Sequence, residues 1–386
     1  MFMCGKSPAL EARLAAEILS GGPMPFDRFM ARALYDPDGG YYASSGKRVG
    51  KSGDFITNVS MGPVFGEVMA GQIVEMWEAL GRPGDFVVCE QGANDGHLAA
   101  DILRGLEPTP LSGVRMILIE PVPALRRVQQ ELLRGANVSW VAAPDELPEM
   151  CGVHYSNELL DALPVHVLRS HGTGWSELSV AREHDRFVWS EGPPGDEVRL
   201  LAESLPLRPQ GFTTEVCTGY GALMRGVGER IRRGFFLAID YGLSAREFLD
   251  EHRREGTLRC YSRHRQDGRP LEDVGQKDLT AHVNFSHLVQ AADAAGWSLG
   301  GFADQHHFLV GAATKMLLAL DGQPNPTKLR PLTALLHPEN MGRQFQAIVF
   351  SRSVLDAQLS GFQYARPSAS RFLSSPPALA GSWLCN

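Results

Sequence analysis

Short apolar runs alternate with stretches of helical periodicity through the middle of the chain. Runs of this kind, bounded by turn residues, predict strands that are buried on both faces. They lie at 86–90, 114–119, 152–156 and 234–240. Between the first two runs, apolar residues recur at helical spacing over 98–106. Strands joined by helices in this way predict an α/β fold with a mostly parallel central sheet.

Helical periodicity also predicts helices on either side of these runs, each with its apolar residues on one face. These helices are expected at 9–19, 25–34, 64–80, 123–134 and 219–233. Residues 165–190 instead alternate apolar and polar positions around a glycine-rich turn. Alternation with a period of two predicts an antiparallel meander, which we expect to be added to the main sheet.

Three segments lack such patterning. Residues 36–54 are rich in turn-forming residues and predict a loop over the domain. Residues 250–285 are polar and rich in Arg and His, which predicts a long functional loop. Residues 366–386 are rich in Ser, Pro and Ala, which is typical of a loosely held tail.

These patterns divide the chain into three regions. An N-terminal helical cap is expected over 1–85, a Rossmann-like core over 86–352 and a C-terminal tail over 353–386. The core is expected to carry inserted segments near 165–215 and 250–300. The predicted fold is therefore a Rossmann-like α/β domain with added antiparallel strands and extra N-terminal and inserted helices.

Composition narrows the class of protein. Hydrophobic residues make up 44% of the 386 residues and charged residues 21%, which is ordinary for a folded globular chain. A net charge of −7 argues against nucleic acid as a partner, because such binding needs a basic face. No apolar stretch approaches the roughly 18 residues of a membrane span. The N-terminus has no signal-peptide run and carries Glu11 and Glu17, so we expect a cytoplasmic protein.

Cysteine and histidine spacing gives no metal motif. The six cysteines form no CxxC pair, and Cys89 lies within a predicted strand as a small core residue. The remaining candidates for metal binding are His264, His282, His306 and His307. None of these has the spacing of metal ligands, so we interpret them as structural and assign no metal site.

The turn after the first predicted strand is the main candidate for cofactor binding. It reads Glu-Gln-Gly-Ala-Asn-Asp-Gly over 90–96, with Gly92 and Gly96 on either side of Asn94. Asn is the residue other than glycine that best tolerates positive φ, so a sharp turn remains possible. Glu90 and Asp95 give the turn two negative charges.

Charge favours one class of cofactor at this turn. A dinucleotide loop usually reads GxGxxG and places a pyrophosphate at a helix N-terminus, where Glu90 and Asp95 would repel it. S-adenosylmethionine has no phosphate and carries a sulfonium and an ammonium group, which the acidic side chains would attract. The charge of the turn therefore favours S-adenosylmethionine over a dinucleotide. Glu120 ends the second strand, where a carboxylate can accept hydrogen bonds from both ribose hydroxyls of either cofactor. A solvated surface carboxylate is the alternative interpretation of Glu120.

The segment after the third predicted strand is the candidate acceptor site. Asn157 and Glu158 follow that strand, and Asp161 lies three residues beyond Glu158. Glu158 and Asp161 would share a face if the turn were helical. Paired carboxylates can hold a guanidinium through bidentate hydrogen bonds and so direct a nitrogen lone pair at a methyl group. The alternative is a helix N-cap at Asn157 with Glu158 in the first turn.

Several motifs together resemble the MidA-like methyltransferases, whose mitochondrial members are complex I assembly factors. The resemblance runs from about residue 23 to about 352, and its motifs occur in the family's order. They are PFDRFMARALYDPDGGYY at 25–42, GDFIT at 53–57, FGE at 65–67, NELLDALPVHV at 157–167, IDYG at 239–242, GTLRCYSRH at 256–264, DLTAHVNF at 278–285 and MGRQF at 341–345.

This resemblance implies a class I methyltransferase fold and an S-adenosylmethionine-dependent enzyme acting on a protein arginine. A respiratory-complex subunit is the partner implied by the mitochondrial members. Donor contacts are implied at Gly53, Asp54, Phe55, Thr57, Glu90, Gly92, Gly96 and Glu120. Asn94 is added as a donor contact because of its place in the turn. Asn157, Glu158 and Asp161 are implied on the acceptor side.

Two other functions stay open at this point. The family commonly has Glu-Leu-Gly-Pro-Gly-Arg-Gly at the cofactor turn, from which residues 90–96 depart. This departure allows a non-catalytic module that binds S-adenosylmethionine and assists assembly. An NAD-dependent dehydrogenase is disfavoured by the acidic turn.

Overall fold

The computed structural model describes residues 8–43, 61–262, 265–319, 325–337, 342, 344–354 and 357–364. Its largest sheet has the strand order β15-β16-β10-β5-β2-β3-β4, and β14 pairs with β10. Every pairing from β10 to β4 is parallel, whereas β16 and β15 are antiparallel additions at one edge. The strands are β2 (Phe86–Gln91), β3 (Arg115–Ile119), β4 (Val138–Val141), β5 (Met150–Asn157), β10 (Ile231–Leu243), β14 (Val283–Asn284), β15 (Ser298–Asp304) and β16 (Phe345–Arg352). The prediction of a mostly parallel α/β sheet is confirmed.

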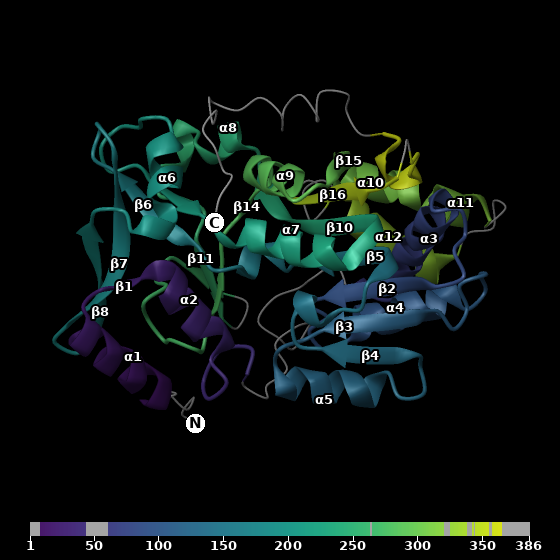
Figure 1. The fold of residues 1–386 in the computed structure, drawn as a ribbon, viewed down its shortest axis with the longest axis horizontal. Coiled ribbons are helices and arrows are strands. Elements are labelled where there is room, and N and C mark those ends of the chain that lie inside the picture. Colours follow the sequence, from purple (N-terminus) through teal and green to yellow (C-terminus); the bar gives the residue numbers. More distant parts are fainter. Residues whose placement is uncertain are drawn as a thin grey trace.

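Two smaller sheets accompany the main one. The five-stranded sheet consists of β1 (Met24–Pro25), β6 (His166–Ser170), β7 (Trp175–Glu183), β8 (Arg186–Gly192) and β9 (Thr213–Val216). The three-stranded sheet consists of β11 (Arg259–Ser262), β12 (Arg265–Asp267) and β13 (Asp278–Thr280). In Figure 1 the five-stranded sheet lies with α1, α2 and α6 on one side of the molecule, and the main sheet lies on the other.

Helices connect these strands and cover the sheets. The α-helices of the first half are α1 (Pro8–Gly21), α2 (Phe26–Tyr35), α3 (Val64–Ala79), α4 (His97–Leu106) and α5 (Pro123–Leu132). Those of the second half are α6 (Asp196–Ser204), α7 (Gly219–Arg230), α8 (Ala245–Phe248), α9 (Phe285–Ala294), α10 (Gln305–Ala312), α11 (Thr314–Leu318) and α12 (Pro326–Leu336). None of the helices among the described residues has both the length and the apolar character needed to cross a bilayer.

Alternation along the buried strands divides the core into two layers. In β2, Val87 and Cys89 pack in a cluster with α2, α7 and α9, whereas Val88 packs in a second cluster with α3, α4 and α10. Successive side chains of a strand point to opposite faces, so a strand that is apolar at every position needs helices on both sides. Cys89 is fully buried, as predicted.

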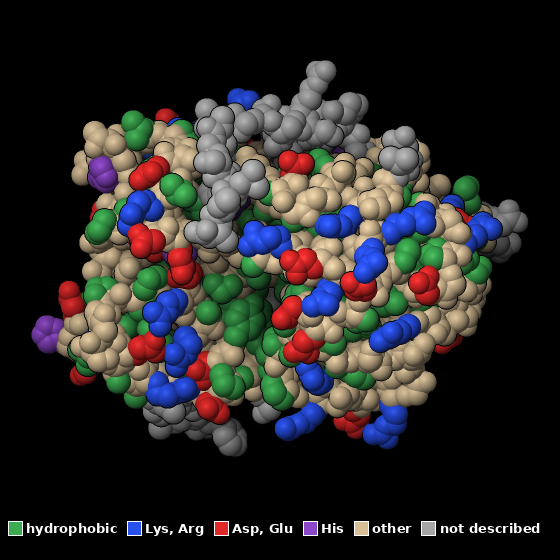
Figure 2. All heavy atoms as spheres, viewed as in Figure 1, with side chains coloured by type: hydrophobic (Ala, Val, Ile, Leu, Met, Phe, Trp, Pro, Cys, Tyr) green, Lys and Arg blue, Asp and Glu red, His purple; other side chains and the backbone are tan. Residues whose placement is uncertain are grey.

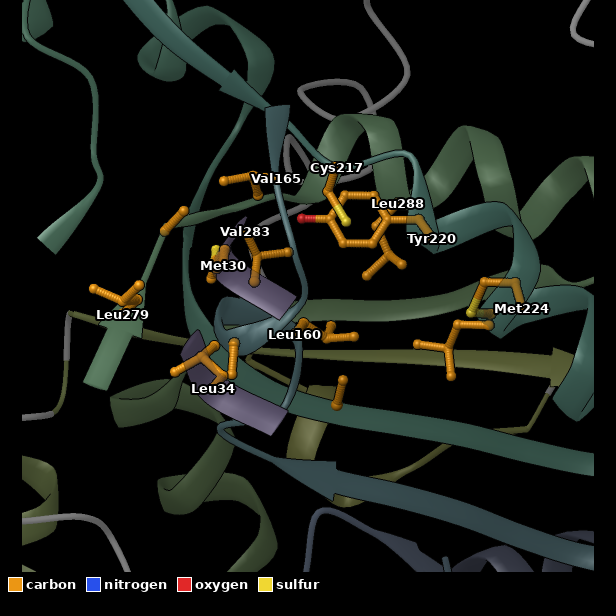
Figure 3. Close-up of a cluster of buried hydrophobic side chains, with 14 of the residues drawn as sticks. Met30, Leu34, Leu160, Val165, Cys217, Tyr220, Met224, Leu279, Val283 and Leu288 are labelled. Carbon is orange, nitrogen blue, oxygen red and sulfur yellow. The ribbon is translucent and has the colours of Figure 1, made fainter. Parts of the chain in front are cut away.

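The first of these clusters joins the N-terminal region to the main sheet. Figure 3 shows Met30 and Leu34 of α2 close to Leu160, which follows β5, and to Leu279 and Val283. All of these side chains are buried. The core thus fixes the turn after β5 relative to α2.

Two predictions about the fold are wrong. The meander of 165–190 does not join the main sheet, because β6 and β7 pair with β9 and with the short strand β1. The segment 250–285 is not one long loop, because it contains β11, β12 and β13. The proposed tail at 366–386 lies outside the described residues, and the division into three regions stays a prediction.

Candidate active site

A cavity of about 610 Å³ lies at the carboxyl ends of β2, β3 and β5. From β2 the chain proceeds to β3 and β4 on one side and later to β5 and β10 on the other. Ligands of open α/β sheets bind where the strand order reverses in this way. On the face in Figure 2, hydrophobic side chains gather where the surface is hollowed, between the part of the molecule carrying α2 and the part carrying β2–β4.

The turn after β2 forms one wall of this cavity. Gly92, Asn94 and Gly96 all have positive φ, at 79°, 48° and 86°. The turn therefore has the left-handed residues that the sequence predicted, with Asn94 taking a conformation that glycine would otherwise supply. Gly96 is the N-cap of α4, and the backbone N–H of His97 donates to the Asp95 carboxylate at 3.3 Å.

Alanine at Gly92 is expected to disturb this wall. Its Cβ would lie 3.0 Å from Leu159 Cδ1, and the residue would keep a φ that disfavours an L side chain. We expect Gly92→Ala to destabilise the fold by about 1–2 kcal/mol and to weaken donor binding. Urea unfolding and calorimetry measure the two effects. Gly84→Ala is the matched control because nothing lies within 4 Å of its Cβ, and equal behaviour of the two variants would contradict this account.

Glu90 reaches the cavity from the end of β2 although its side chain is almost wholly buried. The Tyr155 hydroxyl of β5 donates to its Oε2 at 2.6 Å. Burial raises the pKa of Glu90 to about 8, and the charges of Asp95 and Glu120 add to this rise, whereas the Tyr155 hydrogen bond opposes it. A buried carboxyl with a raised pKa, lining a cavity, is a favourable site for a cation.

Glu120 ends β3 and is held from two sides. Its Oε1 accepts from the Val122 backbone N–H, and its Oε2 accepts from Gln129 Nε2, both at 2.9 Å. Burial raises its pKa to about 7, against the effect of these hydrogen bonds. The alternative of a solvated surface carboxylate is excluded because Glu120 is only 3% exposed.

Gln129 connects Glu120 with the turn after β2. Its Nε2 also donates to the backbone carbonyl of Asn94 at 2.7 Å, and its Oε1 accepts from Trp140 Nε1 at 2.9 Å. It is fully buried, although α5 has an otherwise half-exposed surface. The sequence analysis missed Gln129, because its role depends on three segments that meet only in the fold.

The raised pKa values of Glu90 and Glu120 predict how donor binding depends on pH. Both carboxyls have pKa values above the ordinary 4.5, so the folded protein without donor holds extra protons between about 4.5 and 8. Its free energy of unfolding therefore falls as pH rises through that window. Binding a cation needs the ionised carboxylates, so affinity for S-adenosylmethionine should rise on the order of 100-fold from pH 6 to pH 8.5, with most of the rise due to Glu90. Calorimetry at the two pH values checks this, and Glu90→Gln should show a smaller rise in affinity. An equal rise in that variant would show that ionisation of Glu90 does not control donor binding.

The acceptor candidates separate in the structure. Asn157 and Glu158 line the cavity, and Asn157 Nδ2 donates to Glu158 Oε1 at 3.0 Å. Glu158 has a φ of 56° and precedes the short 3-10 turn Leu160–Ala162, so the expected helical face shared with Asp161 does not form. Asp161 is buried and is not among the described residues that line the cavity. Burial, together with the charges of Asp240 and Asp278, raises the pKa of Asp161.

Asp240 of β10 organises the turn that carries these residues. Its Oδ2 accepts from the backbone N–H groups of Leu159 and Leu160, at 3.1 and 2.7 Å. Its Oδ1 accepts from the Tyr241 N–H at 2.8 Å. The alternative of an N-cap at Asn157 is wrong, because Asp240 supplies the acceptor for this turn. A carboxylate at the end of a strand was the available sequence signal, as it was for Glu120.

Two tyrosines also line the cavity. Tyr35 and Tyr42 line it with their rings stacked, 5.4 Å between centroids and 18° between planes. The Tyr35 hydroxyl donates to the Ala162 carbonyl, and that of Tyr42 donates to Asp278 Oδ1. Neither was predicted as a site residue. Their fixed aromatic faces are suited to contact with a cation.

Some predicted residues cannot be placed. Gly53, Asp54, Phe55 and Thr57, as well as His264, lie outside the described residues. The donor roles predicted for the first four stay predictions. The roles predicted for Glu90, Gly92, Asn94, Gly96 and Glu120 also stay predictions, although the described structure brings these five residues to one cavity or its adjoining turn.

The residues present fit a methyl donor of the S-adenosylmethionine type. The cavity has the size of small-molecule sites, which range over about 300–1,000 Å³. Glu90 is buried and partly protonated at neutral pH, so a cation beside it would stabilise its ionised form. Gly92 leaves open the space that a Cβ would fill against Leu159. When bound, S-adenosylmethionine supplies a methyl group on a sulfonium.

Comparison with known proteins agrees with this chemistry. The family model described as "Putative S-adenosyl-L-methionine-dependent methyltransferase" matches residues 68–303. The crystal structure of a COG1565 superfamily member from Burkholderia thailandensis, bound to S-adenosyl-homocysteine, is 33% identical with a TM-score of 0.84. The alignment covers 95% of this chain and 97% of that one.

Curated relatives point to the same group. The protein arginine methyltransferase NDUFAF7 of Danio rerio is 28% identical over 86% of this chain and 84% of its own. That of Homo sapiens is 26% identical over 95% of this chain and 89% of its own. Both relatives are mitochondrial by name, so the prediction of a cytoplasmic protein is wrong.

The family model covers more than half of the chain, and the Burkholderia structure covers nearly all of it. The cavity that the fold builds lies where this fold binds its ligands, and its carboxylates suit a cationic donor. The chain belongs to the family of S-adenosyl-L-methionine-dependent methyltransferases.

Proposed function

We propose that this methyltransferase transfers a methyl group to an arginine side chain of a protein. Glu158 carries the proposal, because it lines the same cavity as Glu90 and Glu120 and has a left-handed backbone. A non-glycine residue persists in that conformation only where its surroundings impose it, and such residues cluster at functional sites. The Glu158 backbone N–H donates to the Ile239 carbonyl at 2.9 Å, which helps to hold it there.

Arginine chemistry suits these surroundings. A guanidinium is protonated at neutral pH and must be held so that one nitrogen faces the methyl group. The Glu158 carboxylate can accept hydrogen bonds from two guanidinium nitrogens, and the Asn157 carboxamide lies beside it. The stacked rings of Tyr35 and Tyr42 offer an aromatic face to the same cation.

The named relatives favour the same acceptor class, since they are protein arginine methyltransferases. The resemblance to MidA-like proteins makes a respiratory-complex subunit the first acceptor to test. Gly53, Asp54, Phe55 and Thr57 are included in the proposal as further donor contacts. Asp161 is proposed as a residue that supports the acceptor turn, since the described cavity wall does not include it.

Mass spectrometry of cells with and without the protein tests this function. Methylated arginine should appear on a protein only when the wild-type chain is present. Glu158→Gln should abolish that mark while S-adenosylmethionine binding stays within about twofold, because the donor residues are untouched. Glu183→Gln, at an exposed position of β7, is the matched control. Absence of methylated arginine in wild-type cells, or its persistence in Glu158→Gln cells, contradicts the proposal.

A further inference from the structure

A second group of polar side chains lies away from the cavity, where three elements meet. It consists of Asp27 in the first turn of α2, His166 at the start of β6 and Glu197 in the first turn of α6. One oxygen or nitrogen of each lies within 4.8 Å of the others. None of the three is among the described residues that line the donor cavity.

The ring of His166 is oriented by Glu177. Nδ1 of His166 lies 2.7 Å from Glu177 Oε1, and Glu177 Oε2 accepts from the Gly195 backbone N–H at 2.8 Å. Donation from Nδ1–H to the carboxylate leaves the lone pair on Nε2, directed at Asp27. Metal-binding histidines commonly have this arrangement, in which a carboxylate fixes the tautomer and the ring orientation.

Two buried polar atoms of the group lack hydrogen bonds. His166 is only 3% exposed, and its Nε2 has no hydrogen-bond partner. Asp27 Oδ1 is likewise buried without one. The distance from His166 Nε2 to Asp27 Oδ2 is 3.6 Å, which is longer than a hydrogen bond. Buried polar atoms usually have a partner, so these two atoms are available to bind an ion.

Charge favours a divalent ion over a single proton. Asp27 and Glu177, which are largely shielded from solvent, and the exposed Glu197 surround one imidazole, so at least two carboxylates remain uncompensated when His166 is neutral. Protonation of His166 would offset only one of these charges. A divalent cation would offset two and could give His166 Nε2 and Asp27 Oδ1 the partner that these atoms lack.

We propose that Asp27, His166 and Glu197 bind a divalent transition-metal ion, with Zn²⁺ as the best match to one imidazole and two carboxylates. Ligands of a tetrahedral zinc lie about 2.0–2.2 Å from the ion, so the group must contract slightly. Glu197 is the exposed member of the group. The ion would connect α2 of the N-terminal region with β6 and α6.

Calorimetry of the chelator-treated full chain with Zn²⁺ tests the proposal. Wild type should bind one equivalent, and its melting temperature should rise on binding. Glu197→Gln should bind at least about tenfold more weakly. Glu203→Gln changes an exposed glutamate of the same helix outside the group and should bind as wild type does.

A second substitution tests whether Zn²⁺ binds the whole group or only the exposed Glu197. Asp27→Asn should also weaken binding about tenfold, since it removes a ligand from a different helix. Without metal, Glu197→Gln should melt at the wild-type temperature, because its side chain is exposed. Absence of Zn²⁺ binding by wild type, or equal binding by wild type and Glu197→Gln, would overturn the site and leave His166 as the centre of an ion-pair cluster.

Discussion

Replacing Asp240 by alanine is expected to lower the free energy of unfolding by about 3 kcal/mol. The substitution leaves the backbone N–H groups of Leu159, which is half-buried, and Leu160, which is buried in the core, without their acceptor. Each buried N–H that loses its partner costs about 1–3 kcal/mol. Urea unfolding followed by circular dichroism measures the change as a lower midpoint.

The same substitution should weaken donor binding, because Leu159 packs beside Gly92 in the cavity wall. The unfolding midpoint of Asp240→Asn should lie between those of wild type and Asp240→Ala. The asparagine keeps one oxygen as an acceptor but places its amide N–H₂ toward one of the existing donors. Asp85→Ala changes an exposed aspartate just before β2 and serves as the control. An Asp240→Ala midpoint equal to that of wild type would show that Asp240 does not hold the turn.

Glu120→Ala is expected to weaken S-adenosylmethionine binding about 100-fold. A carboxylate that accepts from two ribose hydroxyls makes two charge-assisted hydrogen bonds, each contributing about 1.5 kcal/mol or more. The loss should appear in calorimetry as a higher dissociation constant with unchanged stoichiometry. Glu131→Ala removes an exposed glutamate from α5 and should bind as wild type does.

Gln129→Leu tests how much donor affinity depends on a residue that supports the site without lining the cavity. Gln129 does not line the cavity among the described residues, but it holds both Glu120 and the Asn94 carbonyl. We expect an intermediate loss of affinity, smaller than that of Glu120→Ala. If Glu120→Ala binds the donor as tightly as wild type, the ribose role assigned to Glu120 is wrong.

The donor side of the site was largely predictable because its signals are local. Glu90 and Glu120 each end an apolar run, and the carboxyl ends of parallel strands meet at one edge of the sheet. Asn94 lies between two glycines, so its left-handed conformation follows from the turn itself. In both cases the sequence signal lies within a few positions, although distant residues such as Tyr155 and Gln129 then hold these groups in place.

The acceptor side was less predictable because distant segments determine it. The spacing of Glu158 and Asp161 predicts a shared face only for a helical turn, and Asp240 imposes a different turn from 79 to 81 residues away. Gln129 depends on contacts with Asn94, Glu120 and Trp140, none of which is adjacent in sequence.

The second sheet illustrates the same limit. Alternation correctly predicts strands at 165–190, but it does not specify which edge they join. β1, only two residues long, pairs with β7 across more than 150 positions, and no periodicity can signal so short a strand. The group Asp27, His166 and Glu197 arises from this pairing of distant segments, which is why spacing gave no metal motif.

Calorimetric titration of the purified protein with S-adenosylmethionine, and separately with NAD, tests the central claim most directly. The buried carboxylates of the cavity predict one binding site for S-adenosylmethionine, weaker binding at pH 6 than at pH 8.5, and no binding of NAD. Binding of NAD without binding of S-adenosylmethionine would contradict the assignment of the cavity to a cationic methyl donor.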